Sequence, residues 1–151
     1  MSDTEPPPGD PADDPGVIDL ATKIFSFARR GDTASLGAYL AAGVPVDLAN
    51  DKGDTLVMLA AYHGHADTVE ALCTRGADPD RPNDRGQTPL AGAVFKGEDA
   101  VVEALIRHGA DPHAGTPSAT DAARIFQKEH YLRLFETRTP NGPFWTATDT
   151  D

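Results

Sequence analysis

Cysteine is almost absent from this chain, because Cys73 is the single example among 151 residues. One cysteine cannot form a disulfide within the chain, and it cannot hold zinc without other ligands nearby. Its place in the helical pattern described below favours packing in the core over redox chemistry. The histidines form no better site, since His63 and His65 have no carboxylate or thiolate at ligand spacing. We therefore expect no metal and no cofactor.

Long apolar runs are also missing. No stretch approaches the roughly 18 consecutive apolar residues that a membrane-spanning helix requires. The first residues lack the basic and apolar regions of a signal peptide. The sequence therefore predicts a cytoplasmic protein with no membrane partner.

Positive charge is scarce, with 13 Lys and Arg against 24 Asp and Glu and a net charge of −11. Five of the acidic groups lie in residues 1–17, which contain no base, and two more are Asp149 and Asp151, so the remaining residues carry a net charge of −4. Binding a polyanion needs Lys and Arg clustered on one face. Nucleic acid is therefore not the expected partner.

Catalytic signatures are absent as well. The chain contains no Gly-rich phosphate loop, no His-Glu-x-x-His and no Gly-x-Ser-x-Gly. We therefore expect that the protein is not an enzyme; a weaker alternative, chemistry at Cys73, is open to a thiol-reactivity assay.

The two ends differ in composition from the middle. Residues 1–17 combine Pro, Gly and Asp with almost nothing apolar, which predicts a disordered acidic tail. Residues 137–151 are expected to form a flexible tail in which Phe144-Trp145 is either a docking motif or a segment that covers the last repeat. Residues 18–136 are expected to form one folded, monomeric domain.

An internal repeat occupies that middle region. The segment Asp84-Arg85-Gly86-Gln87-Thr88-Pro89-Leu90 follows its counterpart Asp51-Lys52-Gly53-Asp54-Thr55-Leu56-Val57 by 33 residues. Aligned without a gap, residues 51–83 and 84–116 are identical at 13 of 33 positions, and these are mostly turn formers, helix caps and apolar residues. A fixed period of this length is typical of a stacked array.

Each repeat has the pattern of two short helices. Thr55 and Thr88 are predicted to cap the first helix of their repeats, and glycines are predicted to end both helices. Residues 18–50 are a degenerate first copy with a predicted cap at Asp19, and residues 117–136 are an atypical fourth copy with Ser118 as its cap. In this last copy Arg124 and Glu136 replace core residues, as an end repeat that faces water requires.

Asp-x-x-Gly-x-Thr-Pro-Leu, Gly64-His65, the Val-x-x-Leu second helix and Gly-Ala-Asp-Pro together resemble the ankyrin repeat. The resemblance covers residues 18–136 and is strongest in the two central copies. The chain departs from the family pattern at Leu56, Met58, Ala91, Glu98 and Gln127. Met58 and Ala91 replace a histidine that ties successive turns together in the family, so rigidity between repeats is the property that these departures affect.

The resemblance implies an all-α solenoid of about four helix-turn-helix repeats, capped at both ends, with short hairpin-like fingers. It also implies a non-catalytic module, an adaptor or regulator, that binds a protein through the finger tips and the exposed ends of the first helices. Position by position, these residues are Arg29, Arg30, Asp51, Lys52, Asp54, Tyr62, His63, Asp84, Arg85, Gln87, Phe95 and Lys96.

Stacking should align Arg29-Arg30, Tyr62-His63 and Phe95-Lys96 into a basic and aromatic stripe that suits an acidic partner surface. The alternative is that these residues are merely solvated, as we expect for Glu70 and Glu103. A second functional interpretation is an inhibitor or immunity-type protein, which would abolish the activity of its isolated partner at equimolar ratio. The usage of Ala, Asp, Arg and Gly indicates a bacterial source with a GC-rich genome.

Overall fold

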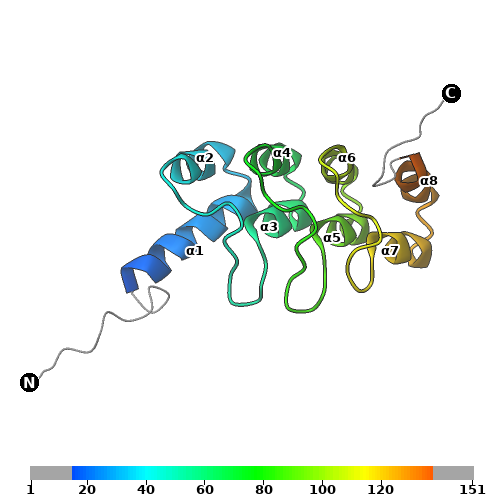
Figure 1. The fold of residues 1–151 in the computed structure, drawn as a ribbon, viewed down its shortest axis with the longest axis horizontal. Helices are drawn as coiled ribbons and strands as arrows, with labels where there is room; N and C mark the ends of the chain where they lie inside the picture. The colour runs from blue at the N-terminus through cyan, green and yellow to red at the C-terminus, as the bar shows by residue number, and fades with distance from the viewer. Residues whose placement is uncertain (1–14, 138–151) are drawn as a thin grey trace, which may run out of the picture.

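The computed structural model describes residues 15–137 of the chain. The predicted tails outside this range, including Phe144-Trp145, lie beyond the described residues. Figure 1 shows the helices in two parallel rows, with loops that project away from the rows between successive pairs. The arrangement confirms the predicted all-α repeat solenoid.

The inner row contains α1 (Pro15–Arg30), α3 (Leu56–Tyr62), α5 (Pro89–Lys96) and α7 (Ala119–Ile125). The outer row contains α2 (Thr33–Ala41), α4 (Ala66–Thr74), α6 (Asp99–Arg107) and α8 (Glu129–Thr137). Each inner helix packs against its outer partner and against the next inner helix, as α3 does with α4 and α5. Within residues 15–137 there is no strand, and the β pairing consists of isolated bridges such as that between Ala49 and Thr55.

Helix starts in the last three repeats follow the predicted caps. The hydroxyls of Thr55 and Thr88 accept hydrogen bonds of 3.2 Å from the backbone N–H groups of Met58 and Ala91, respectively. Ser118 forms a capping box at the start of α7. Each cap satisfies a backbone donor that a helix start would otherwise leave without a partner.

The predicted start of the first helix is wrong. Asp19 lies inside α1, which begins at Pro15, so the residues Pro15, Gly16 and Val17 belong to the helix and not to the tail. Proline favours the first helical position because its φ is already helical and because an N–H there would have no partner within the helix. The first helix therefore begins within the stretch whose composition predicted the tail.

The core lies between the two rows. The apolar positions predicted for the two central repeats are buried, among them Val57, Val69, Leu72, Leu90 and Leu105, each at most 1% exposed. Ala60 and Ala93 are fully buried in the inner row, where their small side chains let neighbouring helices approach closely. Cys73 is half-buried at the edge of this core.

The last repeat ends the array as its polar substitutions predicted. Arg124 and Glu136 are exposed, whereas Phe135 is buried on the face toward the third repeat. Tyr131 is also buried, and its hydroxyl donates a hydrogen bond to Asp99 on α6. This bond lowers the pKa of Asp99, and burial followed by the bond itself raises the pKa of Tyr131. The contact attaches the end repeat to its neighbour.

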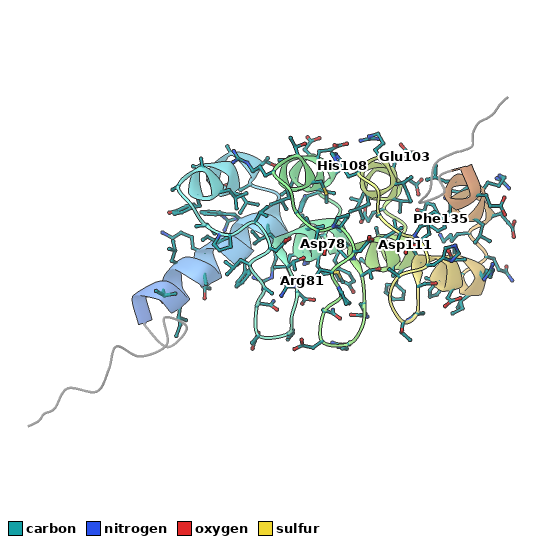
Figure 2. The ribbon with its side chains drawn as sticks, in the orientation of Figure 1. Asp78, Arg81, Glu103, His108, Asp111 and Phe135 are labelled. Carbon is teal, nitrogen blue, oxygen red and sulfur yellow. The ribbon has the colours of Figure 1, made fainter. Side chains whose placement is uncertain are left out.

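Hydrogen bonds also tie successive repeats to one another. The backbone N–H of Asp78 donates to Asp47 Oδ1 at 3.0 Å, and that of Asp111 donates to Asp80 Oδ1 at 2.7 Å, at equivalent points one repeat apart (Figure 2). Nε2 of His65 lies 2.7 Å from the carbonyl oxygen of Arg29. Each of these bonds joins a side chain of one repeat to the backbone of the neighbouring repeat.

Glu70 is not the solvated charge that its outer-row position predicted. Its two carboxylate oxygens contact Arg107 and Nε2 of His108, the latter at 2.6 Å, and both partners belong to the next repeat. The outer helices α4 and α6 pack side by side, and this brings the three side chains together. Glu103, one repeat later, is exposed as expected.

Candidate partner-binding face

Two asparagines shape the fingers. Asn50 Oδ1 accepts hydrogen bonds of 2.9 Å from the backbone N–H groups of Lys52 and Asp54. Asn83 Oδ1 accepts equivalent bonds of 3.0 Å from Arg85 and Gln87. Sequence reasoning did not assign these asparagines to the site, although their 33-residue spacing and their place just before the finger are visible in the sequence.

The fingers are also bonded to one another. The N–H of Asp84 donates to the carbonyl of Lys52 at 3.0 Å, and Asn83 Nδ2 donates to Asp54 Oδ1 at 2.8 Å. One oxygen of Asp54 is therefore used within the protein. Because the tips of successive fingers are held together in this way, they present their remaining side chains as one surface.

A groove of about 580 Å³ lies between the fingers and the inner helices. Nine of the twelve predicted partner-binding residues line it, namely Arg29, Asp51, Lys52, Asp54, Tyr62, His63, Asp84, Arg85 and Gln87, and Asn50, Met58, Leu59 and Asn83 complete the lining. The structure therefore brings together residues from three repeats that are far apart in the sequence.

The other three predicted residues lie elsewhere. Lys96 stands over the ring of Tyr62, with Nζ 5.0 Å from the ring centroid, so it adjoins the groove. Phe95 lines a second, apolar groove described below. Arg30 turns away, because its guanidinium bonds to Ser26 Oγ at 3.0 Å and lies over the ring of Phe27.

The electrostatic environment of His63 includes charges from three successive repeats. Partial burial is the main cause that lowers the pKa of His63, and the positive charges of His65, Arg29 and Lys96 lower it further. Arg29 and Lys96 belong to the first and third repeats, whereas His63 belongs to the second. Cationic groups of the first and third repeats therefore act on His63 at the ends of the inner helices.

The second groove, of about 310 Å³, lies between α3, α5 and α7. It is lined by Met58, Tyr62, Gln87, Ala91, Gly92, Phe95, Pro117, Ala122, Ile125 and Phe126. Sequence reasoning missed Ile125 and Phe126. The sequence does contain this information. Ser118 lies 30 residues after Thr88, three fewer than the repeat period, and the same offset aligns Ile125 with Phe95 and Phe126 with Lys96.

The described residues offer little for other kinds of chemistry. Over residues 15–137, no group of three or more His, Cys, Asp or Glu side chains is arranged to hold a metal ion. In the same range, no helix combines the length and the apolar character needed to cross a bilayer. Burial, with a smaller contribution from the charge of Asp47, raises the pKa of the Cys73 thiol to about 11.

We expect Cys73 to react slowly with thiol reagents in the folded protein. With a pKa of about 11, only about a thousandth of the thiol is ionised at pH 8, and the thiolate is the reactive form. Iodoacetamide alkylation, followed by mass spectrometry, should be at least about tenfold faster in denaturant than in native buffer. Equal rates in the two conditions would contradict the burial of this thiol and revive the redox interpretation.

The fold and the groove together define a solenoid of helix pairs with a binding face built from fingers and inner-helix ends. A family model described as ankyrin repeats in three copies matches residues 24–116, which is more than half of the chain. The chain therefore belongs to the ankyrin repeat family. Ankyrin repeats generally mediate protein–protein interaction and are generally non-catalytic.

Two curated relatives share parts of the array. An ankyrin repeat protein of Pseudomonas aeruginosa is 53% identical over 47 residues, which cover 31% of this chain and 28% of the relative. Human ankyrin repeat domain-containing protein 29 is 48% identical over 54 residues, which cover 35% of this chain and 18% of the relative. Each match spans less than a third of the relative's length.

Proposed function

We propose that the protein is a non-catalytic adaptor or regulator that holds one protein partner on the face formed by the fingers and the inner-helix ends. The observation that carries the proposal is that nine predicted binding residues from three successive repeats line one groove, and that Lys96 stands beside it over the ring of Tyr62. The proposal keeps the cytoplasmic location, the bacterial source and the monomeric state that the sequence predicts.

Charge complementarity favours an acidic surface on the partner. No carboxylate among residues 15–137 forms a salt bridge with Arg29 or Lys96, so both cations remain available to a ligand. The finger tips next to them carry Asp51 and Asp84, which would repel a uniform polyanion such as nucleic acid. A protein surface can place acidic and basic groups separately to match both parts of this face.

Charge reversal at the stripe tests the proposal. Replacing Arg29, Arg30 and Lys96 together by glutamate is expected to abolish capture of the partner from host lysate, with at least about a hundredfold loss of affinity. The physical reason is that the new carboxylates would repel an acidic surface across the same groove. Capture is measured by pulldown with mass spectrometry, and binding of the identified partner by calorimetry.

The matched control replaces Lys23, Arg75 and Arg133 by glutamate, which changes the net charge by the same amount. These three side chains are exposed and line neither groove. Circular dichroism should show unchanged helix content for both triple variants. If the stripe variant captured the partner as well as the control does, the proposed binding face would be wrong.

A further inference from the structure

The row of residues at the ends of the inner helices changes from basic to apolar along the array. Equivalent positions near the ends of the four inner helices carry the pairs Arg29-Arg30, Tyr62-His63, Phe95-Lys96 and Ile125-Phe126. The first pair is basic, the two middle pairs combine a ring with a base, and the last pair is wholly apolar. A ligand that crosses all four helices therefore meets positive charge at one end and an apolar surface at the other.

The apolar end of this row lines the second groove. Phe95 and Phe126 meet edge to face, with ring centroids 5.4 Å apart, and remain 56% and 45% exposed. Ile125 beside them is 66% exposed, while Met58, Ala91, Gly92 and Ala122 form a buried floor. A volume of about 310 Å³ lies at the small end of the range for ligand pockets, about 300–1,000 Å³, and suits one or two large side chains.

The position of Ile125 and Phe126 in the last repeat does not explain why they are exposed, since an end repeat needs polar residues where it faces water. Arg124 already gives the last repeat its polar side, whereas Ile125 and Phe126 continue the row toward Phe95 on the face shared by all repeats. Contiguous apolar side chains with a polar rim are typical of sites where another molecule binds. Lys96 and Gln87 form part of that rim.

We propose that this face binds an extended acidic segment of the partner that carries one large apolar side chain, and that the side chain anchors in the Phe95–Phe126 groove. The inference rests on the proposed function, since it specifies the chemistry of what that face holds. Carboxylates of the segment lie along the basic end, first at Lys96, whose Nζ stands over the ring of Tyr62, and then at Arg29. The change from basic to apolar residues along the row also sets the direction in which the segment crosses the repeats.

The repeat geometry predicts the spacing within that segment. Packed helices lie about 8–10 Å apart, and an extended chain advances about 3.3 Å per residue, so each repeat corresponds to about three residues of ligand. Carboxylates are therefore expected about three and about six residues from the apolar anchor. A compact cluster of acids next to the anchor would not match the face.

Selection from random peptides tests this chemistry directly. Peptides of about twelve residues, long enough to cross the inner helices, are displayed on phage and selected on the full-length protein. The expected result is a consensus of one aromatic or large aliphatic residue with acids at the predicted spacing. The best peptide is then synthesised, and its affinity is measured by fluorescence anisotropy.

Two variants test where the apolar side chain of the peptide binds, and a third tests where its carboxylates bind. Phe126→Ala removes one wall of the apolar groove, and Gly92→Leu fills the groove from a helical position where an added Cβ meets only ordinary contacts at 3.4 Å or more. Each is expected to weaken the selected peptide at least about tenfold, as is Lys96→Glu. Ile18→Ala is the control, because it removes an apolar side chain of similar exposure, 47%, outside both grooves.

The outcomes separate this inference from the proposed function. A consensus without acids, a consensus without an apolar residue, or a failure to select any peptide overturns the inference, yet capture of a native partner by the stripe would still stand. A different outcome is that peptide selection succeeds only after Phe144 and Trp145 are replaced by alanine. That result would overturn the proposal that a partner's segment occupies the groove, and it would assign the groove to the chain's own C-terminal segment. Loss of binding in Phe126→Ala and Lys96→Glu, with retention in Ile18→Ala, supports the inference.

Discussion

Replacing Leu105 by alanine is expected to lower the free energy of unfolding by about 2–5 kcal/mol. Leu105 lies on α6 with none of its surface exposed, within the core that α6 shares with α4 and α5. The substitution removes apolar surface that folding buries and leaves a cavity that the surrounding helices can fill only in part. In a stacked array the loss also weakens both interfaces of the third repeat.

Urea denaturation followed by circular dichroism measures this effect. Leu20→Ala is the matched control, because Leu20 is also helical but 38% exposed, and we expect a change of at most about 1 kcal/mol there. A lower m-value in Leu105→Ala would indicate that the repeats on either side unfold separately. A loss below about 1 kcal/mol at Leu105 would contradict the packing described for the central repeats.

Replacing Gly53 by alanine is expected to cost about 2 kcal/mol or more. Gly53 has a φ of +77°, which disfavours any side chain, and an added Cβ would lie 2.8 Å from the backbone N of Asp84. That nitrogen donates the bond to Lys52 that ties the two fingers together. The substitution therefore strains its own turn and also displaces the next finger.

Gly76→Ala separates these two effects. Gly76 has a φ of +95°, but an added Cβ would meet nothing within 4 Å, so only the backbone strain of about 1–2 kcal/mol is expected. Thermal unfolding of both variants gives the difference, which measures the contact between fingers. Gly53→Ala should also weaken partner binding, whereas Gly76→Ala should not. Equal destabilisation of the two variants would show that the finger contact contributes nothing to stability.

Some features of the fold follow from chain-local chemistry and could be predicted. Thr55 and Thr88 cap helices because a hydroxyl at that point satisfies a free backbone donor, whatever the rest of the fold does. Even Gln127, where the pattern lacks its helix-ending glycine, adopts a φ of 57°. The position in the repeat imposes this left-handed conformation, which the Cβ of glutamine disfavours.

Some outcomes depended on side-chain contacts that the sequence pattern does not give. Glu70 has the sequence context of a solvated helix charge, and only the stacking of α6 beside α4 gives it Arg107 and His108 as partners. Arg30 has the position of a stripe residue, but its guanidinium lies over Phe27 on its own helix. Neither result can be obtained from spacing, because rotamers and packing between helices decide them.

The sequence by itself determined the period, the helix pairs, the caps of the first helices in the last three repeats and most of the buried positions, because each of these depends mainly on residues within one repeat of about 33. It also predicted most of the residues that line the larger groove, since stacking brings equivalent positions into one row. The tertiary structure alone decided that Asp54 is tied to Asn83, that Lys96 stands over the ring of Tyr62, and that Ile125 and Phe126 complete an apolar groove with Phe95. These contacts join side chains from different repeats, and their distances depend on how one repeat is rotated and translated onto the next.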